Sequence, residues 1–147
     1  LVGDKWTTFR ALAANLSDRA LSLMGRERQR STADTPIGGG RDFPQTDSAR
    51  AAWIAANGDG RDPEFGDRLL ERYGTRATEL LAALPAEPTE IPGVPAYSVE
   101  ELPHLAADEQ NVHLHDLLLR RTSVALVGAL TRESTEGAAA ALAPALG

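Results

Sequence analysis

Residues 8–24 read TFRALAANLSDRALSLM, and their apolar side chains set the fold class. The apolar residues recur at the spacing of an α-helix, about 3.6 residues per turn. They would form one face made of Phe9, Leu12, Ala13, Leu16, Ala20 and Leu23. This spacing predicts a helix over residues 8–24 that ends near Gly25.

The composition extends this helical character to the whole chain. Alanine and leucine number 25 and 20, whereas valine and isoleucine together number only 9. Because Ala and Leu favour helices and buried parallel strands need runs of Val and Ile, a parallel α/β fold is excluded. We expect an all-α fold, an irregular helical bundle of about five to six helices with a Pro/Gly-rich connector.

Capping residues and breakers predict the remaining helices. Thr46 or Asp47 can cap a first one, and Asp62 followed by Pro63 is a strong start for another. We expect helices over residues 46–57, 62–73 and 75–84. The four prolines of residues 85–97 exclude a helix there.

The last part of the chain begins with Ser98 followed three residues later by Glu101, the pattern of a capping box. It predicts a short helix to about Ala107. Apolar spacing then predicts a better helix over residues 108–119, and an Ala-rich one over residues 131–146.

Charge is segregated along the chain, whose net charge is −6. This acidic balance argues against a nucleic-acid partner, and the absence of cysteine excludes disulfides and thiolate chemistry. Residues 85–119 hold no Lys or Arg, but they are followed at once by Arg120 and Arg121. We expect one of these arginines to pair with an acidic side chain among Glu101, Glu109 and Asp116.

Two motifs resemble ligand sites but are interpreted as structural. Gly38-Gly39-Gly40 lacks the Lys-Ser/Thr of a phosphate loop, so we expect a plain loop. Glu109, His113 and Asp116 would share one helical face that could hold a divalent metal. On a helix, His113 and His115 diverge by about 200° and could not bind one ion. We interpret this face as one that binds arginines, and expect no metal site.

Residues 3–8, GDKWTT, form the most informative segment for function. Lys5 is the only lysine among 15 basic residues and directly precedes the predicted first helix. A helix N-terminus carries partial positive charge and unpaired amides, and Gly3 permits close approach of the backbone to a ligand. The segment is either an anion site or an ordinary threonine-capped helix start.

These residues resemble a known motif. Gly3 through Arg10 is similar to the Gly-Gly-Lys-x-Thr-Thr-Tyr-Arg segment of FAD-dependent glycerol-3-phosphate dehydrogenases. The likeness continues at Arg72-Tyr73-Gly74 and through residues 97–122, in the same order. The matching acidic and basic positions of that last stretch are Glu101, Glu109, Asp116, Arg120, Arg121 and Thr122. Asp4 in place of the second glycine, and Phe9 in place of tyrosine, depart from the motif.

The resemblance implies that the chain is part of a longer enzyme oxidising glycerol 3-phosphate to dihydroxyacetone phosphate with FAD, the electrons passing to quinone. Residues 1–30 would belong to the parent's flavin domain and residues 31–147 would form its helical C-terminal domain. Lys5 would be catalytic, and the cofactor-binding residues would be Gly3, Lys5, Trp6, Thr7 and Thr8.

The resemblance also implies that the fragment alone holds no FAD, because the glycine fingerprint of dinucleotide binding is not in its sequence. We expect a cytoplasmic location, with the parent at the inner face of the membrane. The alternative is a helical module that docks a protein or a membrane surface and has no redox role.

Overall fold

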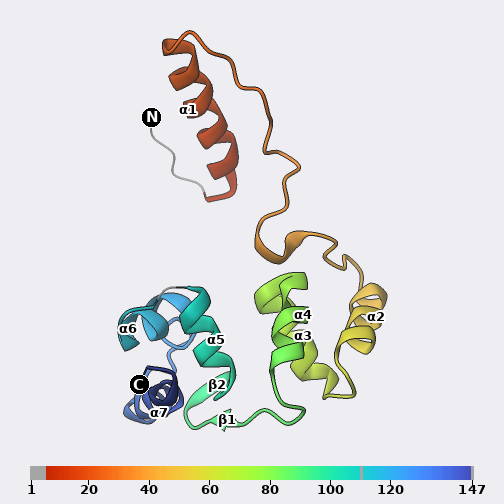
Figure 1. The fold of residues 1–147 in the computed structure, drawn as a ribbon, viewed down its shortest axis with the longest axis vertical. Helices are drawn as coiled ribbons and strands as arrows, with labels where there is room; N and C mark the ends of the chain where they lie inside the picture. The colour runs from red at the N-terminus through yellow and green to blue at the C-terminus, as the bar shows by residue number, and fades with distance from the viewer. Residues whose placement is uncertain (1–5, 110, 147) are drawn as a thin grey trace. The chain divides into compact units, whose positions relative to one another are not determined.

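The computed structural model describes residues 6–109 and 111–146 of the chain (Figure 1). Residue contacts divide the chain into two compact units, residues 1–37 and residues 38–147. We call these the N-terminal unit and the C-terminal unit, and each is described by itself.

The N-terminal unit contains one long helix, α1, which spans Phe9–Leu23. The 3₁₀ turn η1, Trp6–Thr8, leads into it. Met24 ends the helix, and Gly25 follows with a φ of 67°, the left-handed conformation that commonly terminates helices. The predicted helix and its end near Gly25 are therefore confirmed.

The C-terminal unit begins with helices whose starts follow their capping residues. The Thr46 hydroxyl accepts a hydrogen bond from the Ala49 N–H at 3.2 Å, and the Asp62 carboxylate accepts one from the Glu64 N–H at 3.1 Å. The predicted starts are thus confirmed. The elements are η2 (Gly38–Gly40), α2 (Asp47–Asn57), α3 (Pro63–Tyr73), η3 (Gly74–Arg76) and α4 (Ala77–Ala83).

The triple glycine, expected to be a plain loop, forms the short 3₁₀ turn η2. It packs against the end of α3 so closely that a Cβ added to Gly39 would lie 1.9 Å from the Tyr73 carbonyl oxygen. Gly74, which faces Gly39 across this contact, has a φ of 61°, and a Cβ added to it would lie 2.3 Å from the Gly39 carbonyl oxygen. Thr75 adds a hydrogen bond from its hydroxyl to the Arg41 carbonyl at 2.8 Å. Only glycine fits at positions 39 and 74.

A β-hairpin occupies the proline-rich connector, which the sequence indicated only as non-helical. Strand β1 (Glu90–Ile91) pairs antiparallel with β2 (Val94–Ser98). Pro92 and Gly93 join them, and Gly93 has a φ of 69°. Proline followed by glycine at positive φ is typical of a type II turn.

The chain after the hairpin departs most from prediction. Helix α5 spans Glu101–Asp108 and begins with the predicted capping box, in which the Ser98 hydroxyl accepts the Glu101 N–H at 3.2 Å. The helix predicted over residues 108–119 is wrong. The chain leaves the helix at Glu109 and resumes at α6, Leu114–Asp116, which continues as a π-helical turn, η4, over Leu117–Arg121.

The physical reason for this break is a new cap at His113. Its backbone is extended, with φ −130° and ψ 152°, and its N–H donates to the Asp116 carboxylate at 3.1 Å. The regular apolar spacing of this stretch therefore belongs to two short helices, α5 and α6, and not to one continuous helix. The last helix, α7 (Arg132–Leu146), is confirmed, and Ser134 donates its N–H to the Thr131 hydroxyl at 3.1 Å at its start.

Two apolar clusters hold the C-terminal unit together. One contains residues of α3 and α4 and the residue that follows α4: Phe65, Leu69, Ala77, Leu81 and Leu84. The larger gathers buried residues of the hairpin, α5, η4 and α7, with Leu102 and Leu117 fully buried. Tyr73 packs against both clusters, so it lies where the two cores meet.

The expected fold class is confirmed, since the described residues are predominantly helical with only a two-stranded sheet. Within residues 6–109 and 111–146, none of the helices has the length and apolar character needed to cross a membrane.

Candidate functional site

The site predicted at residues 3–8 falls partly outside the described residues. Gly3 and Lys5 belong to the part of the chain that is not described. Trp6, Thr7 and Thr8 form η1, so they do lie at the N-terminus of α1 as predicted. Thr8, the last residue of this 3₁₀ turn, takes the N-cap position of α1.

Helix α1 keeps its apolar face exposed. None of its residues is buried, and Phe9, Leu16 and Leu23 are 55%, 53% and 85% exposed. Polar contacts join the helix to the following segment: Arg10 donates to the Thr32 carbonyl, and Arg28 pairs with Asp18 at 2.8 Å. The stripe that predicted the helix thus stays largely exposed in the described part of its own unit.

The best-defined polar site is a buried carboxylate in the C-terminal unit. Glu101 is completely buried. It forms an ion pair with Arg72 and accepts a hydrogen bond from the Tyr73 hydroxyl at 2.6 Å. Arg72 also donates to the Ala96 carbonyl at 3.0 Å and lies 3.7 Å from the centroid of the Tyr97 ring. This cluster ties the end of α3 to the hairpin and the start of α5.

The electrostatics of the cluster keep both Tyr73 and Arg72 protonated, as hydrogen-bond donors. Burial, and then the negative charge of Glu101, raise the pKa of the Tyr73 phenol well above its usual range, so it remains a donor. Burial opposes the charge of Arg72, yet the carboxylate of Glu101 raises its pKa further. Because Glu101 is completely buried and its carboxylate is held by Arg72 and Tyr73, we interpret the cluster as structural.

The predicted pairing of the double arginine is confirmed. Arg120 contacts the Asp116 carboxylate at 2.7 Å, and Arg121 contacts that of Glu109 at 3.3 Å. Both pairs are substantially exposed, which limits each to about 0–1 kcal/mol of stability. Glu101, the third candidate, pairs instead with Arg72. No sequence signal linked Arg72 to Glu101, because the two residues are 29 positions apart.

The divergence expected between His113 and His115 is wrong. Because His113 precedes α6 with an extended backbone, the 100° per residue of a helix does not apply to it. The two rings stack with centroids 5.1 Å apart, and Asp116 lies beside both. Glu109, in contrast, belongs to the end of α5.

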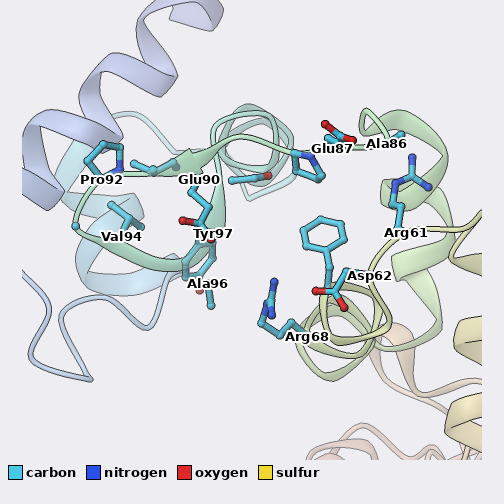
Figure 2. A pocket seen from close by; sticks show the side chains of 15 residues that line it. Arg61, Asp62, Arg68, Ala86, Glu87, Glu90, Pro92, Val94, Ala96 and Tyr97 are labelled. Carbon is cyan, nitrogen blue, oxygen red and sulfur yellow. The ribbon is translucent and has the colours of Figure 1, made fainter.

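A cavity of about 850 Å³ lies between the hairpin and α3. Figure 2 shows Glu90 and Tyr97 of the hairpin on one side, and Asp62 and Arg68 on the other. The Nε atom of Arg68 is buried without a hydrogen-bond partner among the described residues, and its guanidinium lies 5.7 Å from the Phe65 ring centroid. Because the walls carry acidic as well as basic groups, the cavity does not define an anion site.

Comparison with known proteins places the chain in a family of enzyme C-terminal domains. The chain belongs to the family described as the C-terminal domain of alpha-glycerophosphate oxidase, whose model matches residues 30–147. No solved structure matches the chain.

Curated proteins that are similar to the chain are named glycerol-3-phosphate dehydrogenases or a subunit of one. The chain is 29% identical over 131 residues to glycerol-3-phosphate dehydrogenase 2 of Mycobacterium tuberculosis and of Mycobacterium bovis, covering 86% of this chain and 22% of each relative. It is 31% identical over 88 residues to the anaerobic glycerol-3-phosphate dehydrogenase subunit A1 of Haloferax volcanii, covering 60% and 14%. The chain therefore spans 22% or less of the length of these relatives.

Proposed function

We propose that this chain is the helical C-terminal domain of an FAD-dependent enzyme that oxidises glycerol 3-phosphate to dihydroxyacetone phosphate and passes the electrons to quinone. The family match over residues 30–147 carries this proposal. The similarity to proteins named glycerol-3-phosphate dehydrogenase supports it. The two packed cores and the buried Glu101 cluster suit a scaffold, and we assign residues 31–147 that role.

The described residues do not fit FAD by themselves. A dinucleotide site in such enzymes needs parallel strands and a glycine-rich turn that leads into a helix. The described sheet has two antiparallel strands, and Gly39 packs against backbone rather than bordering an open helix N-terminus. FAD would supply the redox chemistry from the parent's own flavin domain, and no step of the reaction is assigned to residues 31–147.

We further propose that residues 1–30 belong to that flavin domain and that residues 3–8 form one edge of its site. Two observations support this. Helix α1 exposes its apolar stripe, which a neighbouring domain could cover, and residues 1–37 form a unit separate from residues 38–147. Lys5 would supply positive charge beside the positive end of the helix dipole, where an anionic group of substrate or cofactor would be stabilised.

The experiment is a comparison of the chain with its full-length parent. We expect the purified parent to contain FAD and to reduce a dye or quinone acceptor with glycerol 3-phosphate. We expect the 147-residue chain alone to be colourless, with a circular dichroism spectrum dominated by helix. A parent without glycerol 3-phosphate oxidation would overturn the proposed activity, and a yellow chain with stoichiometric FAD would overturn the division of roles.

A further inference from the structure

His113, His115 and Asp116 bring three metal-binding groups together on the surface of the C-terminal unit. One ligand atom from each lies within 4.8 Å of the others. The His113 Nδ1 atom is 3.6 Å from one carboxylate oxygen of Asp116, and the His115 Nε2 atom is 3.5 Å from the other. Both rings are more than half exposed, so they are open to a ligand from solvent.

These separations are too long for hydrogen bonds between the two rings and the carboxylate. An N–H···O bond has a donor–acceptor distance of about 2.7–3.2 Å, and both nitrogen–oxygen distances exceed it. The imidazoles therefore face the carboxylate without bonding to it.

The separations do match those between ligands of a small divalent ion. With metal–ligand distances of about 2.0–2.1 Å and tetrahedral angles, neighbouring ligand atoms lie about 3.3–3.4 Å apart. The observed 3.5 and 3.6 Å each fall within a few tenths of an ångström of that spacing, although they are measured to different oxygens of Asp116. The two nitrogens must approach each other more, which exposed side chains can do by small rotations.

The backbone already holds the carboxylate in place. The His113 N–H donates to Asp116 at 3.1 Å, and this bond belongs to the cap that starts α6. The carboxylate therefore faces both rings from a position that this bond fixes. Arg120 lies 2.7 Å from one oxygen of Asp116. It is the described cation that would compete with a metal ion for this carboxylate.

We propose that His113, His115 and Asp116 form a binding site for a divalent transition-metal ion of the zinc type. Two imidazoles and a carboxylate suit Zn²⁺, and three protein ligands leave a further coordination position for water. The site lies outside the segment assigned to the flavin domain, and the inference stands apart from the proposed redox activity.

The test is calorimetric titration of the 147-residue chain, without a polyhistidine tag, with zinc chloride. We expect one zinc ion per chain. His113→Ala, His115→Ala and Asp116→Asn should each weaken binding by about tenfold or more, since even the loss of a group that only supports a ligand costs about that much. Asn at position 116 can still accept the His113 N–H, so this variant keeps the cap.

The chain offers a matched control, since its third histidine, His104, is exposed on α5. His104→Ala should leave zinc affinity unchanged. Arg120→Gln should bind zinc at least as tightly as the wild type, because a competing cation is removed. Absence of zinc binding, equal loss in His104→Ala, unchanged affinity in both cluster histidine variants, or weaker binding in Arg120→Gln would each overturn the proposal. Circular dichroism of every variant checks that the helices are retained.

Discussion

Substitution of Arg72 by methionine tests whether the buried ion pair holds the C-terminal unit together. Methionine keeps most of the apolar length of the side chain but removes the charge. Glu101, which is completely buried, would then keep only the Tyr73 hydroxyl and the Ser98 N–H as partners. The variant also loses the hydrogen bond from Arg72 to the Ala96 carbonyl.

The expected loss of stability follows from leaving a buried charge unpaired. Removing one partner of such a pair costs about 3–5 kcal/mol. Because the Arg72 side chain is 20% exposed, we expect the lower end, about 3 kcal/mol. For a domain of this size, a loss of about 3 kcal/mol lowers the melting temperature by about 12 °C.

The assay is urea unfolding followed by circular dichroism, with Arg76→Met as the matched control. Arg76 lies just beyond α3 and pairs with Asp108 at 3.1 Å, but both side chains are more than half exposed, so its loss should cost about 0–1 kcal/mol. Adding Glu101→Gln to Arg72→Met should restore part of the stability, because the unpaired charge is gone. The reasoning is refuted if Arg72→Met behaves like the control, or if the double variant is less stable than Arg72→Met alone.

Two further predictions concern the turn at Gly74 and the acid stability of the unit. Gly74→Ala should lower the free energy of unfolding by more than about 1 kcal/mol, because φ is 61° and the new Cβ would meet the Gly39 backbone. Thermal melting measures the change, and an unchanged melting temperature would contradict the close packing. Burial disfavours the charged form of Glu100, but hydrogen bonds from the Thr89 N–H and hydroxyl lower its pKa below 4.5. Its contribution is therefore complete above pH 4.5 and lost as the pH falls through the folded-state pKa. Urea midpoints should show Glu100→Gln less stable than the wild type at pH 7, with a smaller difference at pH 3; a difference that grows in acid would contradict the assignment.

Helix ends could be predicted where one side chain near in sequence determines them. Thr46, Asp62 and Ser98 each accept a backbone N–H two or three residues ahead, and Gly25 takes a positive φ. Such signals are local, and these boundaries were confirmed.

The features that were missed depend on competing or distant interactions. The helix expected over residues 108–119 looked continuous because its apolar spacing is regular, but His113 and Asp116 form a cap in the middle of it. The hairpin was missed although Pro92-Gly93 is a turn signal, because β1 is only two residues long and too short for an alternating pattern.

The sequence could predict one of the ion pairs but not the buried one. Arg72 and Glu101 are 29 residues apart, and nothing local indicates that they meet. The pairing of Arg120 with Asp116, four residues apart on one helical turn, could be predicted. The role of Lys5 rests on the motif it resembles, so it stays a prediction.

The turnover of the full-length parent with Lys5→Ala tests the central claim most directly. The measurement is steady-state oxidation of glycerol 3-phosphate with a dye acceptor, beside a thermal melt of both proteins. Loss of one positioned charge beside a developing anion costs about 2.7–4 kcal/mol, so we predict a hundred- to thousandfold lower rate, roughly, with an unchanged melting temperature. A variant with the parental kcat and KM would contradict the assignment of residues 3–8 to the active site.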